Sequence, residues 1–452
     1  MRRIALLLSA ISLAACGLLP GLARPTASPR PGGVFTATAG GISRGTPIGA
    51  STPGGTQPAA NDTPGAGITL TPPPGTPGGP VALRVWLPPE FTPDVSTRGG
   101  QVLADQIQVF ETAHPGTAVE IRTKADSGVG GLLNALATAA NAAPSVVPDV
   151  IALSRDDLAA ATAAGLVAPL DSLLPADTLA DYYPYAQTMA RVGGVWVGLP
   201  FAGTARVLTY MNTTYVSPPL RWTDVVTGPI ALPVGEGSGL TVLDSYLAAG
   251  GTLVDANNKP HLDSEALAST LQAYQHLQTT GLLLPTTLDY ADTATTWQAL
   301  RDRRAVIAIT DTGRFLSEYF RVSGADVTLL PTAGEPQLAL ADGWAWAIVN
   351  TTPERHALAA ELIQWLSAPA QNGPWSQATA VLPARADSLA AWTQPGLATV
   401  VADLETHTQL QPTAAVLAAM GPALQEALSA VLNGRATPFA AATVAAAAIN
   451  QP

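Results

Sequence analysis

Three carboxylates follow the ends of apolar segments of the sequence. Carboxylates at such positions can take part in catalysis or bind a ligand. Asp156 follows the apolar run 148–153, Glu236 follows 229–234, and Asp311 follows 305–310. Two carboxylates on opposite sides of a cleft are the arrangement with which glycosidases cleave a sugar linkage. Such groups can also accept hydrogen bonds from hydroxyl groups or pair with the ammonium groups of a cationic ligand. The residue types alone leave these uses open.

Asp156 belongs to a charged cluster, SRDD at 154–157, that also has a structural interpretation. Ser154 followed three residues later by Asp157 fits a capping box at the start of a helix, and Gly165 fits the end of that helix. We therefore interpret Asp157 as a helix cap. Asp156 has no such role in the pattern and stays the candidate for contact with a ligand.

Other catalytic and cofactor patterns are missing from the sequence. The five histidines are scattered, without a His-Glu-x-x-His pair or a cysteine cluster, so we expect no metal site. No nucleophile elbow and no phosphate-binding loop occurs. We expect no cofactor and no enzymatic activity, with a glycosidase as the enzyme alternative. The formal net charge of −11 argues against nucleic acid as a partner.

The chain from Val81 onward alternates short apolar strands with amphipathic helices, which predicts an α/β fold with a parallel, doubly wound sheet. This segment is too long for one ordinary core, so we expect two lobes. Helices are predicted from 99 to the residue before Pro115, over 264–280, and through much of the C-terminal part. The predicted strands are 81–86, 117–121, 148–153, 229–234, 305–310, 326–331 and 343–349.

The first residues, MRRIALLLSAISLAACG, have the layout of an export signal. Their apolar core, Ile4 to Leu13, is too short to span a bilayer. The residues LAAC resemble a bacterial lipobox, so 1–16 is expected to be a lipoprotein signal with Cys16, the only cysteine, as the lipidation site. A chance cysteine in an ordinary signal peptide or uncleaved anchor is the alternative. Residues 17–80 are rich in proline, glycine and threonine, which predicts a disordered tether.

The order of motifs after the tether resembles the extracellular solute-binding proteins of ABC importers, in particular the sugar-binding, maltose-binding-protein-like family. The matching segments are VALRVW with FETAHPGTAVEI, PDVIALSRDDLAAATAAGLVAPLD, GVWVGLPFAGTARVLTYMN followed by RWTDVV, WQALRDRRAVIAITDTGRF, LLPTAGEPQLALADGWAWAIV and HALAAELIQWLSAPAQNGPWSQATAVLPAR. The resemblance implies two lobes that close over a ligand. Crossings between lobes are expected near 200–212, 305–313 and 341–349. Lobe I would comprise 81–205 and 309–343, and lobe II 206–308 and 344–452.

Candidate ligand contacts follow from this resemblance and from the carboxyl ends of the strands, where open α/β sheets bind ligands. Trp86 is expected either to stack on a sugar face or to lie in the core. Trp344 is favoured as a cleft aromatic and Trp346 as a core residue. Thr204 stands where many sugar binders of the family carry a carboxylate. This departure weakens any assignment of a particular substrate to this chain from the resemblance. The expected ligand contacts are Trp86, Glu90, Asp156, Thr204, Arg206, Glu236, Ser238, Thr312, Arg314 and Trp344.

The resemblance implies a function as well as a fold. It implies an exported monomer, held by a lipid anchor at the outer face of the cell membrane or in the periplasm. This receptor would capture a sugar or oligosaccharide and deliver it to ABC permease subunits. The alternatives are a receptor for polyamines or other cationic solutes, and a ligand-sensing lipoprotein that reports to a receptor kinase.

Overall fold

The computed structural model describes residues 81–450 except 258, 333–336 and 351–352. The described residues belong to one compact unit, Pro74–Pro452. The expected signal, Cys16 and the expected tether lie outside the described residues.

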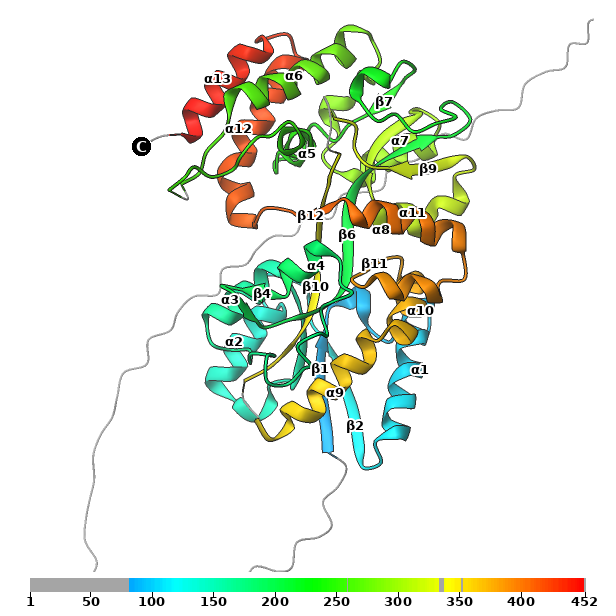
Figure 1. Cartoon of the computed structure of the whole chain (residues 1–452), viewed down its shortest axis with the longest axis vertical. Helices are drawn as coiled ribbons and strands as arrows, with labels where there is room; N and C mark the ends of the chain where they lie inside the picture. Colours follow the sequence, from blue (N-terminus) through cyan, green and yellow to red (C-terminus); the bar gives the residue numbers. More distant parts are fainter. Residues whose placement is uncertain (1–80, 258, 333–336, 351–352, 451–452) are drawn as a thin grey trace, which may run out of the picture. The chain divides into compact units, whose positions relative to one another are not determined.

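A mixed sheet forms the framework of the described residues (Figure 1). The order of its strands is β2-β1-β3-β10-β6-β8-β7, with β9 and β11 paired to β6 and β12 paired to β10. Their bounds are β1 Val81–Leu87, β2 Thr117–Thr123, β3 Val150–Ser154, β6 Leu199–Met211, β7 Ile230–Ala231, β8 Ile307–Asp311, β9 Ala325–Thr328, β10 Ala339–Ile348, β11 Leu382–Pro383 and β12 Thr408–Leu410. Strands β4 (Arg191–Val192) and β5 (Val195–Trp196) form a separate hairpin.

The predicted α/β class is confirmed, but the predicted parallel sheet describes only part of it. Strand β1 pairs in parallel with β2 and β3, and β7 pairs in parallel with β8. In contrast, β10 runs antiparallel to β3 and β6, and β6 runs antiparallel to β8. The sheet is mixed because the two long strands, β6 and β10, run antiparallel to these neighbours.

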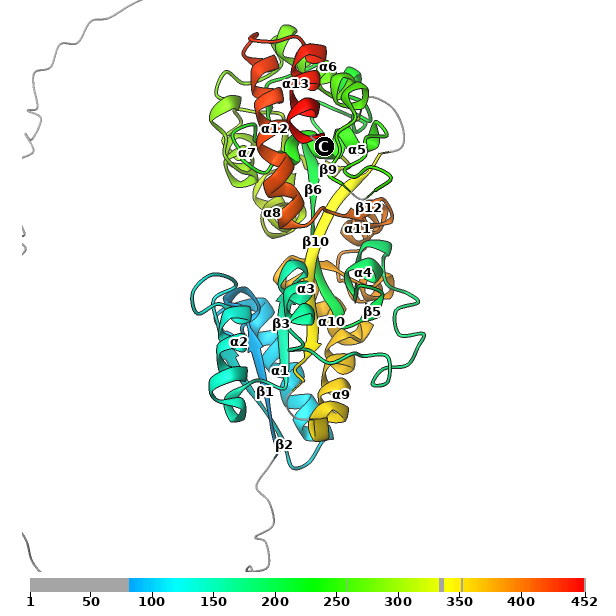
Figure 2. The same ribbon diagram turned by 90° about the vertical axis from the view of Figure 1, so that its left-hand side faces the viewer.

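Strands β6 and β10 connect two lobes (Figures 1 and 2). The first half of β6, up to Ala205, pairs with β10, whereas the second half, from Arg206, pairs with β8 and β9. Every residue of β6 is buried except Thr204, which lies at the change of partner. A third connection runs from the short helix η7 (Ala386–Ala391) through α11 (Pro395–Thr406) and β12.

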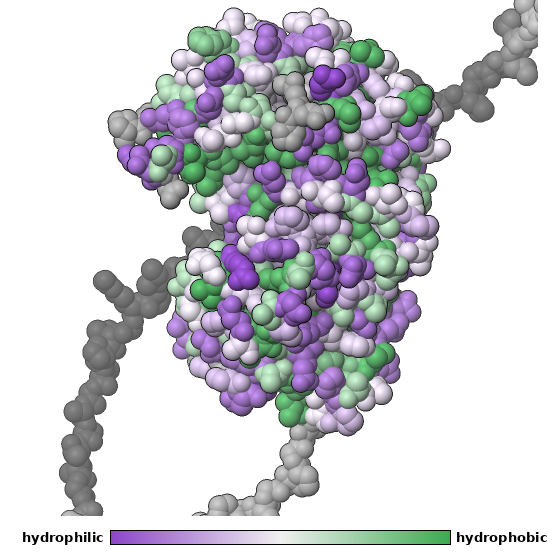
Figure 3. Space-filling view, viewed as in Figure 1, coloured by the Kyte–Doolittle hydropathy of each residue, from purple (hydrophilic) through white to green (hydrophobic). Residues whose placement is uncertain are grey.

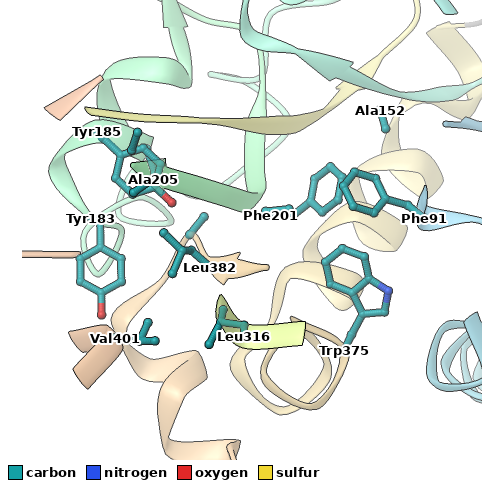
Figure 4. Packing of buried hydrophobic residues seen from close by; sticks show 14 of the residues in the cluster. Phe91, Ala152, Tyr183, Tyr185, Phe201, Ala205, Leu316, Trp375, Leu382 and Val401 are labelled. Carbon is teal, nitrogen blue, oxygen red and sulfur yellow. The ribbon is translucent and has the colours of Figure 1, made fainter. Parts of the chain in front are cut away.

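Lobe I contains β1 to β3 and the helices that pack beside them. Helix α1 packs against α10 and α9, and α10 packs against η7. A group of buried aromatic residues fills the space between β6 and α10 (Figure 4). The helices of lobe I are α1 Arg98–Ala113, α2 Leu132–Ala142, α3 Arg155–Ala163, α4 Pro184–Met189, α9 His356–Ser367 and α10 Pro369–Thr379.

Lobe II contains the second half of β6, strands β7 to β9, and a layer of helices. Helices α6, α12 and α13 pack together, with α5 against α6 and α12. Helix α12 is long and apolar enough to cross a membrane, and its buried residues join the core of lobe II. The helices are α5 Leu240–Ala248, α6 Ser264–Thr279, α7 Thr293–Arg301, α8 Thr312–Glu318, α12 Ala414–Leu432 and α13 Pro438–Ile449.

The predicted division of the chain between lobes differs from the observed packing. Residues 309–343 were expected in lobe I, but β8, α8 and β9 pack on the second half of β6, in lobe II. Residues 344–452 were expected in lobe II, but the end of β10 pairs with β3 and helices α9 and α10 pack in lobe I. Strand β8 therefore makes no crossing near 305–313. The third crossing is instead made by the segment after η7.

Polar and apolar side chains are interspersed on the face of the molecule shown in Figure 3. Larger apolar side chains are gathered in the interior. Trp222, Trp297 and Tyr185 are among the largest fully buried ones.

Candidate functional site

A cavity of about 790 Å³ opens where β6 and β10 pass between the lobes. This volume lies within the range of about 300–1,000 Å³ that is typical of small-molecule sites. Lobe I contributes the loop after β1, the end of β3 and the residues after α10, and lobe II contributes the end of β8 and α8. The lining residues are Glu90, Phe91, Ser154, Ala202, Gly203, Thr204, Asp311, Gly313, Arg314, Ser317, Asp342, Gly343, Trp344, Thr379, Ala380 and Val381.

The floor of the cavity is made of backbone at the place where β6 and β10 approach each other. A Cβ atom on Gly203 would lie 2.2 Å from Oη of Tyr185, and one on Gly343 would lie 2.4 Å from the carbonyl oxygen of Ala202. Both contacts are far shorter than real Cβ contacts, so only glycine fits at these two positions. Glycine at these positions therefore lets β6, β10 and the Tyr185 side chain pack closely at the floor of the cavity.

Aromatic rings form one wall of the cavity. Trp344 is half-buried, and the ring of Phe91 meets it edge-on with the centroids 5.5 Å apart. Phe91 in turn packs against Phe201 and Trp375, as Figure 4 shows. An aromatic face supported in this way is a firm surface for the C–H side of a sugar ring. Trp346 lies in the core as expected, stacked on Phe201 at 4.1 Å.

The cavity carries an excess of acidic side chains. Burial raises the pKa of Glu90, and the nearby charge of Asp126 adds to the rise. Burial also raises the pKa of Asp342, whose Oδ2 accepts a hydrogen bond of 2.7 Å from Nε2 of Gln411. Both carboxylates favour hydrogen-bond donors or a positive charge on a ligand.

Asp311 and Arg314 also line the cavity, but both are partly engaged within lobe II. Oδ1 of Asp311 accepts from the backbone N–H of Arg314 at 2.7 Å and caps α8, while Oδ2 accepts from Oγ1 of Thr293 at 2.8 Å. Nη1 of Arg314 donates to Glu318, one turn further along α8, at 3.0 Å. The positive charge of Arg314 is thus balanced before a ligand arrives.

Four of the expected ligand contacts line the cavity, namely Glu90, Thr204, Arg314 and Trp344. Thr204 is exposed to the cavity because the change of partner along β6 leaves it uncovered. Sequence reasoning did not select Phe91, Ser317, Asp342 or Thr379 as contacts. Asp342 directly precedes the selected stretch GWAWAIV. Thr379 is the last residue of helix α10 and does not follow a strand, so the strand-end rule did not predict it.

Two expected contacts, Arg206 and Glu236, do not line the cavity and are instead bound to each other. Two nitrogens of the Arg206 guanidinium donate to the two oxygens of Glu236, each at 3.0 Å. Glu236 also accepts from the backbone N–H of Thr241 at 2.6 Å. Asp244, fully buried, lies 3.7 Å from Nε of Arg206, and burial raises its pKa to about 7. One guanidinium is shared by two carboxylates. For Asp244, burial raises the pKa by more than the charge of Arg206 lowers it.

Three further expected contacts are not among the lining residues of the cavity. Trp86 is buried in lobe I, with Nζ of Lys124 5.0 Å from the centre of its ring, so its core alternative holds. Thr312 is buried and its Oγ1 accepts the backbone N–H of Ala205 at 3.0 Å. The turn that holds Ser238 packs on α12, where a Cβ atom on Gly421 would lie 2.5 Å from the carbonyl oxygen of Ser238.

Asp156 also lies outside the cavity lining and binds the other lobe. Its Oδ2 accepts the backbone N–H of Ala414, at the start of α12, at 2.8 Å. The neighbouring Arg155 donates to the carbonyl oxygen of Gln411. The predicted cap at Asp157 is corrected by the structure: the capping side chain is that of Ser154, whose Oγ accepts from the backbone N–H of Asp157 at 3.4 Å. These contacts join α3 of lobe I to the segment that leads into α12 of lobe II.

The arrangement of the remaining chemical groups adds no metal site. Within the described part of the chain, no group of three or more His, Cys, Asp or Glu side chains is placed to hold a metal ion. The carboxylate pairs weighed for a glycosidase are also not assembled, since Asp156 and Glu236 both lie outside the cavity that Asp311 lines.

Two lobes joined by crossing strands, with a cavity lined from both, define the solute-binding class of proteins. Residues 105–401 match the family described as bacterial extracellular solute-binding protein, and the chain belongs to this family. The family description and the names of the structural relatives below are those of binding proteins. A search of curated proteins found no match.

Similar solved structures share the fold at low sequence identity. The cyclic α-maltosyl-1,6-maltose binding protein of Arthrobacter globiformis is 19% identical with a TM-score of 0.67, over 82% of this chain and 98% of that one. The extracellular solute-binding protein of Staphylococcus aureus in complex with maltose is 16% identical with a TM-score of 0.64, over 83% and 98%. The maltotriose-bound MalE domain of Bdellovibrio bacteriovorus is 19% identical with a TM-score of 0.59, over 82% and 99%.

Proposed function

We propose that this protein captures an extracellular sugar or oligosaccharide in the cavity between its lobes and delivers it to an ABC permease. The observation that carries the proposal is the pairing of Trp344, backed by Phe91, with the carboxylates Glu90 and Asp342. A sugar ring offers an apolar face to an aromatic side chain and hydroxyl donors to carboxylates, so this combination suits it.

The lobes supply the reason why a ligand would favour closure. Glu90, Phe91 and Trp344 come from lobe I, whereas Asp311, Arg314 and Ser317 come from lobe II. A solute in the cavity gains contacts from both sets only when the lobes are close together, so it stabilises that state. The permease would then receive the closed form, and no bond of the solute is broken.

Lipid anchoring through Cys16 completes the proposal. A lipid on the only cysteine would hold the protein at the outer face of the membrane, with 17–80 as the tether. The test is metabolic labelling with a lipid precursor, followed by mass measurement of the mature N-terminus. Label in the Cys16→Ser variant, or none in the natural protein, would contradict the anchor.

A cationic solute, such as a polyamine, is the second candidate. The acidic lining favours it, because Glu90 and Asp342 face a cavity whose one lining guanidinium, in the described chain, is paired with Glu318. A thermal-shift screen of the full-length protein against sugars and polyamines separates the two, since a bound ligand raises the melting temperature by mass action. A rise with polyamines and none with sugars would overturn the carbohydrate proposal.

A further inference from the structure

One carboxylate of the cavity, Asp342, is held by a residue that does not line the cavity. Asp342 lies in β10, opposite Thr204 in the register with β6. Its Oδ1 accepts the backbone N–H of Gly343 at 2.8 Å, and its Oδ2 accepts Nε2 of Gln411 at 2.7 Å. A carboxylate has about four acceptor sites, so two bonds within the protein leave sites for a ligand.

The backbone of Gln411 is anchored beside Asp342. Gln411 directly follows β12, the strand of the third connection that pairs with β10 (Figure 1). Its backbone N–H donates to the carbonyl oxygen of Ala341 at 2.8 Å. Its own carbonyl oxygen accepts from Nη1 of Arg155, at the start of α3. Because the backbone is fixed at both groups, the side chain has little further freedom to lose when it binds Asp342.

The three carboxylates of the cavity differ in how firmly they are held. Glu90 is exposed and makes no hydrogen bond with another described residue. Asp311 is held within lobe II, by Thr293 and by the backbone of α8. Asp342 is half-buried and is held by a side chain of the third connection. A carboxylate that is oriented before a ligand arrives loses less freedom on binding, so Asp342 suits a directed contact.

The amide of Gln411 also favours the charged form of Asp342. Burial raises the pKa of Asp342, and the charge of Asp156 adds to the rise. The backbone N–H of Gly343, the charge of Arg155 and the amide of Gln411 lower this pKa in part. An ionised carboxylate accepts stronger hydrogen bonds from hydroxyl groups than a neutral acid does. The amide therefore supports both the direction and the charge of this acceptor.

We propose that Gln411 is a positioning residue of the ligand site, whose amide holds the carboxylate of Asp342 in place to accept hydrogen bonds from sugar hydroxyls. The proposal rests on the proposed carbohydrate function and adds a residue of the third connection to the site. Gln411 acts through Asp342, since it is not itself among the lining residues of the cavity.

The first test is calorimetric titration of the full-length protein with maltotriose and with cellotriose. Gln411→Ala should weaken the binding of the sugar that binds by about tenfold, because Asp342 loses its orienting donor. Asp156→Ala is the matched control. It removes the hydrogen bond to the backbone of Ala414 in the same segment and leaves the bond between Gln411 and Asp342 in place. Its dissociation constant should change less than about twofold.

The second test uses Gln411→Glu, whose pH profile separates a positioning role from a structural one. Two carboxylates at hydrogen-bond distance repel each other when both are ionised, whereas a proton shared between them restores the hydrogen bond. The ratio of the dissociation constants of Gln411→Glu and the natural protein should therefore rise about tenfold from about pH 5 to about pH 8. Gln409→Glu places the same charge at an exposed position of β12 and should keep a constant ratio.

The other titratable groups near this pair change little over that pH range. Arg155 and Asp156 of α3 lie 3.5 Å apart and balance each other. Burial raises the pKa of Tyr185 in α4 well above its ordinary value of 10, so its hydroxyl stays neutral. A pH-dependent ratio is therefore a property of the two carboxylates.

The outcomes separate the positioning role from the function on which it rests. Unchanged affinity in Gln411→Ala, or losses equal to those of Asp156→Ala, would overturn the positioning role alone. A constant ratio in Gln411→Glu would do the same, and this ratio decides if Gln411→Ala does not fold. Binding of neither sugar by the natural protein would overturn the carbohydrate function together with the positioning role.

Discussion

The two lobes use similar polar residues at their strand ends in different ways. In lobe I, Glu90 after β1 and Trp344 within β10 face the cavity. In lobe II, Arg206 and Glu236 form a bidentate ion pair and do not line the cavity. The residues of both lobes lie on or next to strands, so their position in the sequence pattern does not distinguish the two roles. What separates the two cases is exposure to the cavity: Arg206 and Glu236 are largely buried in their ion pair, whereas Glu90 and Trp344 line the cavity.

Replacing Arg206 with alanine should have the largest effect of all, and that effect should be on stability. The change leaves Glu236 and Asp244 in the interior without their cation. Removal of one partner of a buried ion pair costs about 3–5 kcal/mol. Urea unfolding measures this loss, and the exposed Arg122→Ala serves as the control, with an expected change within about 0.5 kcal/mol. A similar small change in both variants would remove the distinction between the lobes.

Replacing Trp344 with alanine should have the largest effect on binding. The loss of a central aromatic contact typically costs about 2 kcal/mol or more, which corresponds to a dissociation constant raised about 30-fold. Calorimetry with the sugar identified in the screen measures the change. Trp365, half-buried in α9 and outside the cavity, offers a matched Trp365→Ala control that should retain affinity. Unchanged binding by Trp344→Ala would contradict the aromatic wall as a ligand surface.

Protonation of the buried carboxylate of lobe II, Asp244, should make the stability of the folded protein depend on pH. Burial raises the folded-state pKa of Asp244 to about 7, above its ordinary value of 3.8. The folded protein therefore holds this proton more tightly, so stability should rise as the pH falls through about 7 and level off near about 4. Thermal unfolding at several pH values should show a smaller rise in Asp244→Asn than in the natural protein. An identical pH profile in the two proteins would refute this assignment.

Replacing Asp156 with alanine should have the smallest effect on binding, although the sequence made Asp156 a leading candidate for ligand contact. Its carboxylate accepts the backbone N–H of Ala414 rather than lining the cavity. A partly exposed hydrogen bond of this kind contributes about 1 kcal/mol or less to stability. The dissociation constant should change less than about twofold. A tenfold weakening in calorimetry would return Asp156 to the binding site.

The sequence predicted the elements well because each depends on local patterns. The apolar runs at 81–86 and 148–153 became β1 and β3, and the cap at Ser154 and the glycine at 165 bound α3 as expected. The fold class also followed, since several motifs in one order constrain it more than any of them alone. Lobe boundaries failed because they depend on which strands pair, and β8 pairs with β6 and β7 without leaving lobe II.

The site was predicted less completely because exposure depends on tertiary partners. Thr204 and Arg206 are two positions apart in one strand, yet Thr204 is exposed and Arg206 is buried in an ion pair. The partner that decides this, Glu236, is thirty residues away. Thr379 is the last residue of α10, and the chain that follows it pairs with β6 as β11. No local sequence pattern signals that this helix end lines the cavity.

The anchoring of β6 on both sides of Thr204 has a consequence for the energetics of capture. Gly203 is paired with β10 and β11, and Arg206 is paired with β8 and held by Glu236. The backbone of the floor therefore loses its conformational freedom when the protein folds. A solute that settles on it need not order it again, so the entropic penalty of association falls mainly on the side chains of the walls and on the movement of the lobes.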